Sequence, residues 1–393
     1  MFTHRFPVHW VLMVAAVGFA AGAWAERAAA ERRARPNFVW IIADDQAYTD
    51  FGFMGNHLVQ TPHLDRLAEQ SARFPRGYLP ASVCRPSLAS LLTGLYQHQH
   101  QIHFNHPPHK LGAARHEADY LIRRVRTLPR MLKRAGYTSF QTGKFWEGHY
   151  RNAGFDEGMT LGGEHWIMPA LGWRKAHGNG DAGLLIGRRT MQPIADFLDC
   201  HGEEPFFLWY APVLPHTPHN VAEKYLKPYR DNPEVPELMV RYYASITRFD
   251  DTVGQLMSML RQRHLVRNTL FVFVVDNGWL PNPSDPSRLD PRTKTSPYEF
   301  GVRTPVLLRW DGHIKPATHR ELVSSLDWCR PRWPRRDSTR SAAGCPASTC
   351  CPPPGAKPRC PSDRCSGPPS ATRPQSWSAR RGRCSPAGSA PAS

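Results

Sequence analysis

Residues 329–393 of this 393-residue chain contain no Leu, Ile, Val or Phe, and they are rich in Pro, Arg, Ser and Cys. A segment without large aliphatic side chains cannot bury enough apolar surface to offset the conformational entropy lost on folding. We therefore expect this tail to be disordered. Because the composition changes abruptly, we hypothesise that the tail is a frame-shifted read of a GC-rich gene; a cysteine-rich metal-binding tail is the alternative.

Cysteine is scarce in the rest of the chain. Before residue 329 the sequence has only Cys84 and Cys200. Two distant cysteines do not make a disulfide framework, although a single pair is compatible with them. The fold must therefore depend on a hydrophobic core.

Long hydrophobic runs are confined to the N-terminus. An apolar run over residues 8–23 follows two basic residues and ends near a small-x-small sequence at residues 23–25. This pattern predicts a secretory signal peptide over residues 1–25, too short for a stable membrane span. We expect a leader over residues 26–36 and an exported chain, periplasmic or secreted.

The net charge of +17 is strongly basic, but more than half of it lies in residues 329–393. No basic helix with interleaved aromatic residues occurs, so we expect no nucleic-acid partner. Hydrophobic residues make up 41% of the chain, enough for one large α/β domain.

Acidic residues follow two apolar runs of strand length. Residues 37–43 end in Asp44 and Asp45, and residues 268–275 end in Asp276, Asn277 and a glycine. Open α/β sheets bind their ligands at the carboxyl ends of such strands. Oxygen ligands suit Ca²⁺ or Mg²⁺, so the two strand ends predict a single cation site; for the first pair a helix N-cap is the alternative.

Residues 82–94 predict a loop that turns into a short apolar helix. Pro86 suits the first helical turn and Gly94 a helix end. Cys84 then lies at the helix N-terminus, where free N–H groups and the helix dipole favour an anion. The alternative is a buried cysteine that acts as a small hydrophobe.

Lys144 and His216 are further candidates. Lys144 follows a predicted short strand and could bind an anion or face solvent. His216 lies between two prolines, which would present it stiffly to a substrate or place it in a surface loop. A patch of histidines admits zinc as an alternative to a structural role: His98, His100, His103 and His106.

Hydrophobic periodicity predicts the remaining elements. Helices are expected over 61–72, 127–136, 186–200 and 238–263, and strands over 137–140, 205–210 and 304–310.

The segment at Cys84 resembles the sulfatase signature, C-x-P-S-R followed by L-T-G, with leucine at position 88 in place of arginine. Together with the two acidic strand ends, it makes residues 37–327 similar to the formylglycine-dependent sulfatases of the alkaline-phosphatase-like superfamily. The resemblance implies an α/β three-layer sandwich with a central, mostly parallel sheet over residues 37–328. The family's C-terminal subdomain is apparently missing.

The resemblance also implies roles for individual residues. Cys84 would be converted to formylglycine by a formylglycine-generating enzyme, and Lys144 and His216 would take part in catalysis. Lys294 would bind the sulfate group, and His149 would stand in for a family histidine whose position Trp146 occupies. Ca²⁺, or Mg²⁺, would be held by Asp44, Asp45, Asp276 and Asn277.

The function implied is hydrolysis of a sulfate ester on a sulfated small molecule or glycan, either a carbohydrate or an aryl ester. Two alternatives remain open: a related phosphohydrolase, and a catalytically impaired sulfatase-like protein or binder of sulfated glycans. The second is favoured by Leu88, Trp146 and the tail. At position 88 the family arginine assists conversion of the cysteine, and Arg85 points about a quarter-turn away.

Overall fold

The computed structural model describes residues 35–106, 117–162 and 182–327. The predicted signal peptide (1–25), most of the leader and the tail (329–393) lie outside the described residues, so export and the expectations for these segments stay predictions. No helix within the described ranges is long and apolar enough to cross a membrane.

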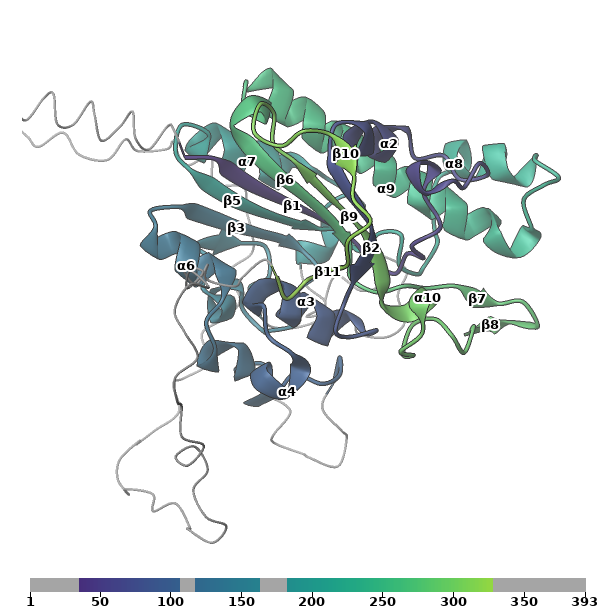
Figure 1. Cartoon of the computed structure of the whole chain (residues 1–393), viewed down its shortest axis with the longest axis horizontal. Helices are drawn as coiled ribbons and strands as arrows, with labels where there is room; N and C mark the ends of the chain where they lie inside the picture. Colours follow the sequence, from purple (N-terminus) through teal and green to yellow (C-terminus); the bar gives the residue numbers. More distant parts are fainter. Residues whose placement is uncertain (1–34, 107–116, 163–181, 328–393) are drawn as a thin grey trace, which may run out of the picture. The chain divides into compact units, whose positions relative to one another are not determined.

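One mixed sheet organises the described part of the chain (Figure 1). Its strand order is β10-β2-β9-β6-β1-β5-β3-β4, and β11 pairs with β2. The central strands β3, β5, β1 and β6 are parallel, whereas β9 is antiparallel to both of its neighbours. The strands are β1 (Asn37–Ala43), β2 (Ala72–Tyr78), β3 (Thr138–Gly143), β4 (Glu157–Gly158), β5 (Phe206–Ala211), β6 (Thr269–Val275), β9 (Arg303–Arg309), β10 (Ala317–Thr318) and β11 (Val323–Ser324), with β7 (Pro281–Asn282) and β8 (Asp285–Leu289) forming a separate hairpin.

Helices cover both faces of this sheet, because its central strands are apolar on both sides. In β1, Val39 and Ile41 join a core cluster with residues of α2, α7 and α9, while Trp40 and Ile42 join a second cluster with residues of α3 and α6. The predicted three-layer α/β architecture is therefore confirmed. The helices are α2 (Pro62–Glu69), α3 (Cys84–Thr93), α4 (Gln97–His100), α6 (Leu128–Arg134), α7 (Gln192–His201), α8 (Glu223–Arg230), α9 (Glu237–Gln262) and α10 (Glu299–Val302).

Short 3-10 helices connect several of these elements: η1 (Gly52–Met54), η3 (Leu121–Arg124), η4 (Tyr150–Ala153), η6 (Ala182–Leu185) and η7 (Val266–Asn268). A third core cluster joins α8 to the first half of α9 through aromatic residues, among them Tyr229 and Tyr242.

The structure corrects two predicted helix boundaries. The helix expected over 186–200 begins only at Gln192, because Gly187 has a φ of +70° that a helix cannot contain. The helix expected over 61–72 ends at Glu69, and Ala72 instead begins β2. This strand was missed because Pro75 and Gly77 interrupt its pattern, and a register shift occurs between Phe74 and Gly77.

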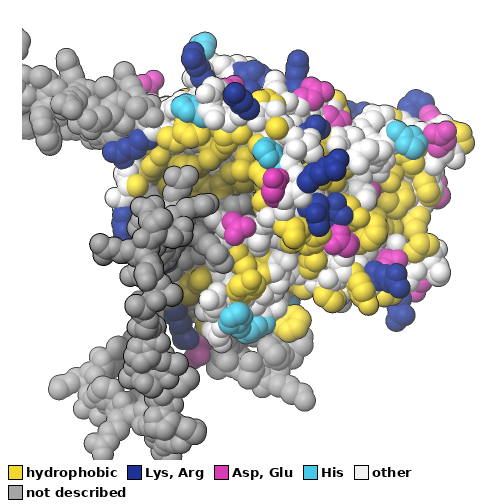
Figure 2. Space-filling view, viewed as in Figure 1, with side chains coloured by type: hydrophobic (Ala, Val, Ile, Leu, Met, Phe, Trp, Pro, Cys, Tyr) yellow, Lys and Arg dark blue, Asp and Glu magenta, His cyan; other side chains and the backbone are white. Residues whose placement is uncertain are grey.

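The face of the sheet towards α3 and α6 is only partly covered. Phe38, Leu270 and Leu308, from three neighbouring strands, are half-buried against the second core cluster. Figure 2, drawn in the same view as Figure 1, shows hydrophobic side chains gathered over this part of the molecule. The helices on this face therefore leave apolar surface of the strands exposed.

Candidate active site

The acidic residues that follow β1 and β6 lie at the same edge of the sheet, as their positions after parallel strands predict. Ala43 pairs in register with Val275, the Asp276 N–H donates to the Ala43 carbonyl (2.9 Å), and the Asp45 N–H donates to Asp276 Oδ1 (3.0 Å). Asp45 has a φ of +63°, a left-handed conformation that non-glycine residues rarely adopt. Such strain is typical of functional sites.

Cys84 faces these acids from the first turn of α3. Its side chain is fully buried, and Sγ lies 3.7 Å from Asp45 Oδ1 and 3.9 Å from Asp44 Oδ1. Val83 is extended before the helix, and Gly94 ends it in a left-handed conformation, as expected from the sequence. The position of Cys84 is fixed because every residue of α3 is buried.

Lys144 reaches the acids from the end of β3. The turn depends on Gly143, whose φ is +78° and where a Cβ would lie 1.9 Å from the Ala211 carbonyl oxygen. Lys144 is 1% exposed, and its Nζ forms ion pairs with Asp44 and with Asp276 Oδ2 (3.5 Å). Its ammonium therefore joins the two acidic strand ends and is not exposed to solvent.

Lys294 enters from the segment between β8 and α10. Thr295 has a φ of +71° and its N–H donates to the Ser82 carbonyl (2.9 Å), which holds this segment against the loop before Cys84. Lys294 Nζ lies 2.7 Å from both carboxylate oxygens of Asp45 and 3.1 Å from Cys84 Sγ. The side chain is thus at hydrogen-bonding distance from the cysteine.

His216 completes the cluster from the loop after β5. Its Nε2 lies 3.1 Å from Asp45 Oδ2 and 3.5 Å from Lys294 Nζ, and its Nδ1 lies 2.7 Å from the Thr217 carbonyl oxygen. Burial, followed by the charges of Lys294 and Lys144, holds the pKa of His216 well below its ordinary value. The ring is therefore neutral near pH 7 and can act as a proton acceptor.

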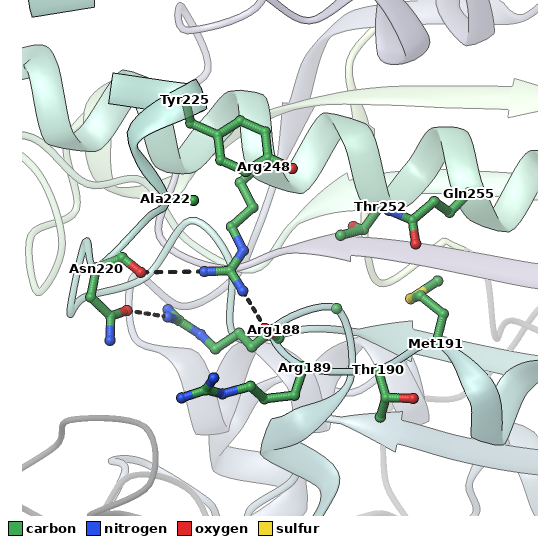
Figure 3. Close-up of a pocket in the computed structure, with 11 residues that line it drawn as sticks. Arg188, Arg189, Thr190, Met191, Asn220, Ala222, Tyr225, Arg248, Thr252 and Gln255 are labelled. Carbon is green, nitrogen blue, oxygen red and sulfur yellow. Dashed lines mark hydrogen bonds between the residues drawn. The ribbon is translucent and has the colours of Figure 1, made fainter. Parts of the chain in front are cut away.

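Arg188 holds the His216 loop from behind, a role that the sequence did not predict. Its guanidinium donates to the carbonyls of Val213 (2.7 Å) and His216 (2.6 Å) and to Asn220 Oδ1 (3.0 Å). Figure 3 shows Arg188 beside Arg248 in a hollow of about 450 Å³, where Arg248 donates to the Arg188 carbonyl. Burial and Arg248 lower the pKa of Arg188 to about 9.

The electrostatics of the cluster follow from burial opposed by pairing. Burial raises the pKa of Asp44 and of Asp276, although Lys144 lowers both in part. For Asp45 burial also acts upwards, but Lys294 and Lys144 outweigh it and the pKa lies below its ordinary value. The pKa of Lys144 is raised because its anionic neighbours, Asp44 first, outweigh burial.

Burial raises the pKa of the Cys84 thiol far above neutrality, and Lys144 and Lys294 offset this only partly. The thiolate is the nucleophilic form of cysteine. An unmodified Cys84 is therefore protonated near pH 7 and a poor nucleophile.

The oxygen donors at the strand ends fit a hard cation. Asp44 Oδ2, Asp276 Oδ2 and Asn277 Oδ1 are buried and have no hydrogen-bond partner among the described residues, which is costly unless another group satisfies them. Carboxylate and amide oxygens are the ligands that Ca²⁺ and Mg²⁺ prefer. Across the described ranges, one group of at least three His, Cys, Asp or Glu side chains brings its ligand atoms within 4.8 Å of one another: Asp44, Asp45, Cys84 and His216.

His149 is the predicted site residue that the structure places apart. Its Nδ1 accepts the Arg151 N–H (3.1 Å) and its ring packs on Tyr150. Trp146, at the family's histidine position, is buried and contacts the ring of His106. A contact of His149 with substrate stays a prediction.

Leu88 and Arg85 take structural positions. Leu88 is buried in the core beside the sheet. Arg85 is buried too, and its guanidinium pairs with Glu147 (2.8 Å) and Asp119 (3.7 Å). Arg85 is therefore committed to Glu147 and does not replace the arginine that position 88 lacks.

In the histidine-rich patch, His100 makes hydrogen bonds within the protein. His100 is buried, and its Nε2 lies 3.1 Å from the Ser90 hydroxyl while its Nδ1 accepts the Ile102 N–H (3.1 Å). Burial lowers the pKa of His100 to about 4. No three ligands of this patch converge in the described part of the chain.

Comparisons with known proteins agree with this geometry. The family model described as Sulfatase matches residues 36–330. N-acetylgalactosamine-6-sulfatase of Rattus norvegicus is 28% identical over 74% of this chain and 60% of its own length, and arylsulfatase A of Homo sapiens is 29% identical over 74% and 62%. The crystal structure of Ps i-CgsB in complex with k-i-k-neocarrahexaose is similar with a TM-score of 0.59 and 26% identity, over 75% of this chain and 70% of that one. The chain thus spans about three-fifths of the length of these curated relatives.

Proposed function

Because this chain belongs to the sulfatase family, we propose that it hydrolyses sulfate esters and that Cys84 provides the reacting group after conversion to formylglycine. One observation supports this most strongly. Cys84 lies at a helix N-terminus within 4 Å of Asp44, Asp45 and Lys294, at the sheet edge where four parallel strands end. In open α/β sheets this edge is where ligands bind.

The fixed cations of the site suit a sulfate group. Lys144 is buried and Lys294 is partly buried, and acidic neighbours raise the pKa of both ammonium groups, so both are charged near pH 7. Preorganised charges in a site that excludes water stabilise an anionic transition state more than solvent does. We assign these two lysines to the sulfate oxygens.

His216 is suited to move a proton. Its neutral ring presents Nε2 to the site, and the Thr217 carbonyl accepts from Nδ1, which orients the ring. Nε2 can accept a proton and return it to the oxygen of the leaving alcohol. Arg188 acts through His216 by holding the loop that carries it.

Two groups would complete the chemistry. Ca²⁺ would be held by Asp44, Asp45, Asp276 and Asn277, of which Asp44, Asp276 and Asn277 each carry an unsatisfied buried oxygen, and it would polarise sulfate oxygens as a Lewis acid. Formylglycine at position 84 would supply a hydroxyl nucleophile, which the protonated thiol is not. The converting enzyme is thereby a proposed partner.

For the substrate we propose a sulfated carbohydrate, with an aryl sulfate as a small substitute. The names of the relatives support this choice: one is a sulfatase of N-acetylgalactosamine 6-sulfate by name, and one solved structure holds a neocarrahexaose. A catalytically impaired binder of sulfated glycans is the second candidate. Leu88 supports it, since this leucine is buried and Arg85 is paired elsewhere.

The test compares the full chain with its Cys84→Ala variant on an aryl sulfate and the matching aryl phosphate, with Ca²⁺ present. We expect the wild type to release sulfate, to leave the phosphate ester largely intact, and to lose activity in the variant. Faster release of phosphate than of sulfate would indicate the related phosphohydrolase. Binding of a sulfated oligosaccharide without turnover would indicate the impaired binder.

A further inference from the structure

A second charged region lies on the surface around α6. It is a hollow of about 460 Å³ lined by arginines of three segments: η3 with the turn after it, α6, and η4. Of the described residues that line it, Val125 and Met131 alone are not arginine. We call it the arginine groove, and its members are Arg123, Arg124, Arg126, Arg130, Arg134 and Arg151.

None of these arginines forms an ion pair with any residue that the structure describes. Arg130 donates to the carbonyls of Ile122 (3.1 Å) and Val125 (2.6 Å), and burial and Arg123 lower its pKa. Arg124, Arg126 and Arg134 are exposed. Because like charges surround one hollow and no described residue that lines it carries a balancing carboxylate, the groove favours a bound anion.

The groove is partly preorganised. Arg123 is fixed by Asn152 Oδ1 (2.8 Å) and stacks on Tyr120, with its guanidinium carbon 4.4 Å from the ring centre. Arg130 is held by the carbonyls below it. The side chains of Arg123 and Arg130 are therefore fixed by local contacts. The exposed side chains of Arg124, Arg126 and Arg134 can turn towards a ligand.

We propose that the arginine groove binds a sulfated polysaccharide chain, as a docking site separate from Cys84. Guanidinium groups bind sulfate and carboxylate oxygens in pairs of hydrogen bonds, and a row of them suits a repeating anion. The choice of sulfate over other anions rests on the proposed function. The affinity should then depend on how many arginines the sulfated chain contacts and not on the identity of one sugar.

Nucleic acid and membranes fit the groove less well. Single strands bind largely by stacking of bases on aromatic rings, and none of the described lining residues is aromatic. α6 has seven residues, a short element for reading a major groove. A membrane surface would need apolar side chains for insertion, and the lining offers only two half-buried ones.

A continuous set of contacts joins the groove to the Cys84 site. Arg123 contacts Asn152, whose Nδ2 donates to the Glu147 carbonyl (2.6 Å), and Glu147 pairs with Arg85, the residue after Cys84. Three residues, Asn152, Glu147 and Arg85, thus link the groove to the helix that carries Cys84.

The test measures binding of a heparin-derived octasaccharide to the full chain in a Cys84→Ala background, so that its outcome does not depend on turnover. One variant carries Arg124→Ser, Arg126→Ser and Arg134→Ser. The matched control carries Arg66→Ser, Arg261→Ser and Arg267→Ser, which remove the same charge from exposed arginines elsewhere. The basic residues 329–393 are common to both variants.

At 150 mM salt we expect the groove variant to bind at least about tenfold more weakly and the control variant less than about twofold. Loss of three contacts should also reduce the slope of log affinity against log salt by about two. Equal weakening in both variants would overturn the proposal, because binding would then follow net charge alone. An equally charged oligo(dT) or anionic vesicles that bind more tightly, with the same dependence on the groove, would also overturn it.

The outcomes separate this inference from the proposed function. Octasaccharide binding that depends on the groove, in a chain that hydrolyses no sulfate ester, would leave the docking site standing and remove the activity. If the chain releases sulfate from an ester but binds the octasaccharide equally well without the groove arginines, the activity would stand and the docking site would be removed.

Discussion

The Cys84 site and the arginine groove use charge in opposite ways. The site holds Asp44, Asp45 and Asp276 against Lys144 and Lys294. These side chains are paired with one another, and all are buried except Lys294, which is partly buried. The groove holds six arginines of one sign, and most are exposed and none is paired within the described residues. Buried charges of opposite sign hold one another in place, whereas an excess of one sign at the surface attracts a mobile partner.

The charges of the Cys84 site and those of the arginine groove should also differ in how much they contribute to stability. A buried charge that loses its partner is strongly destabilising, because its desolvation is no longer compensated. An exposed charge contributes little to stability, since water and salt screen it. The predictions below test this difference from the largest expected effect to the smallest.

Lys144→Met removes the ammonium between Asp44 and Asp276. We expect the free energy of unfolding to fall by about 3–5 kcal/mol without added metal, as for other broken buried pairs. Lys133→Met is the matched control, because Lys133 is 64% exposed in its pair with Asp156 and should cost less than about 1 kcal/mol. Urea denaturation of both variants measures the difference, and equal costs would contradict the account.

Ca²⁺ should stabilise the wild type, because three carboxylates face two lysines in the site and three buried oxygens there have no hydrogen-bond partner among the described residues. At a hundred times its dissociation constant, a ligand that binds only the folded state adds about 2.7 kcal/mol. Asp276→Asn should reduce this gain, whereas Asp196→Asn, at an exposed position on α7, should retain it. Thermal unfolding with Ca²⁺ and with EDTA checks the prediction, and an unchanged melting temperature would contradict the cation site.

Arg188→Lys should loosen His216 without changing charge. The ammonium of lysine is not a planar fork and cannot replace both guanidinium hydrogen bonds, to the carbonyls of Val213 and His216. Because His216 would then be held less firmly, we expect kcat for an aryl sulfate to fall about tenfold with KM nearly unchanged. Arg189→Lys, in the same hollow, is the control. A rise in KM with unchanged kcat would instead show that Arg188 contacts substrate.

Asp250 is a buried charge outside both regions, and it has no cationic partner among its described contacts. It accepts the N–H groups of His63 (3.0 Å) and Leu64 (2.7 Å) at the start of α2, and burial raises its pKa from 3.8 to about 7. The folded state therefore binds the proton more tightly than the unfolded state does.

The contribution of Asp250 to the free energy of unfolding should then be greatest below pH 4. This contribution should be lost as the pH rises to about 7. The slope of the free energy of unfolding against pH that Asp250 contributes is at most about 1.4 kcal/mol per pH unit, and the Asp250→Asn variant should lose this slope. Urea denaturation between pH 5 and 8 checks this, and an unchanged slope in the variant would show that another group titrates.

The sequence could predict which residues of the candidate site lie together wherever these residues follow or begin a regular element. β1 was predicted to the residue, and the acids after β1 and β6 meet because parallel strands end at one edge. Cys84 could be placed for the same reason, since helix signals surround it. The apolar pattern thus fixes which polar residues come together.

Contacts that depend on loops could not be predicted from local patterns. Only the family resemblance placed Lys294 in the site: its side chain reaches Cys84 because Thr295 docks on Ser82, more than 200 positions earlier in the chain. Arg188 was placed inside an expected helix and so its role was missed. The arginine groove was hidden too, because η3, α6 and η4 become neighbours only in the folded chain.

Mass spectrometry of the peptide that contains Cys84 tests the central claim most directly. The full chain should be produced together with a formylglycine-generating enzyme, alongside its Leu88→Arg variant, which restores the signature arginine. The account predicts that the thiol side chain of residue 84 is replaced by an aldehyde in the wild type as well as in the variant. An intact thiol in the wild type, with an aldehyde in the Leu88→Arg variant, would contradict it.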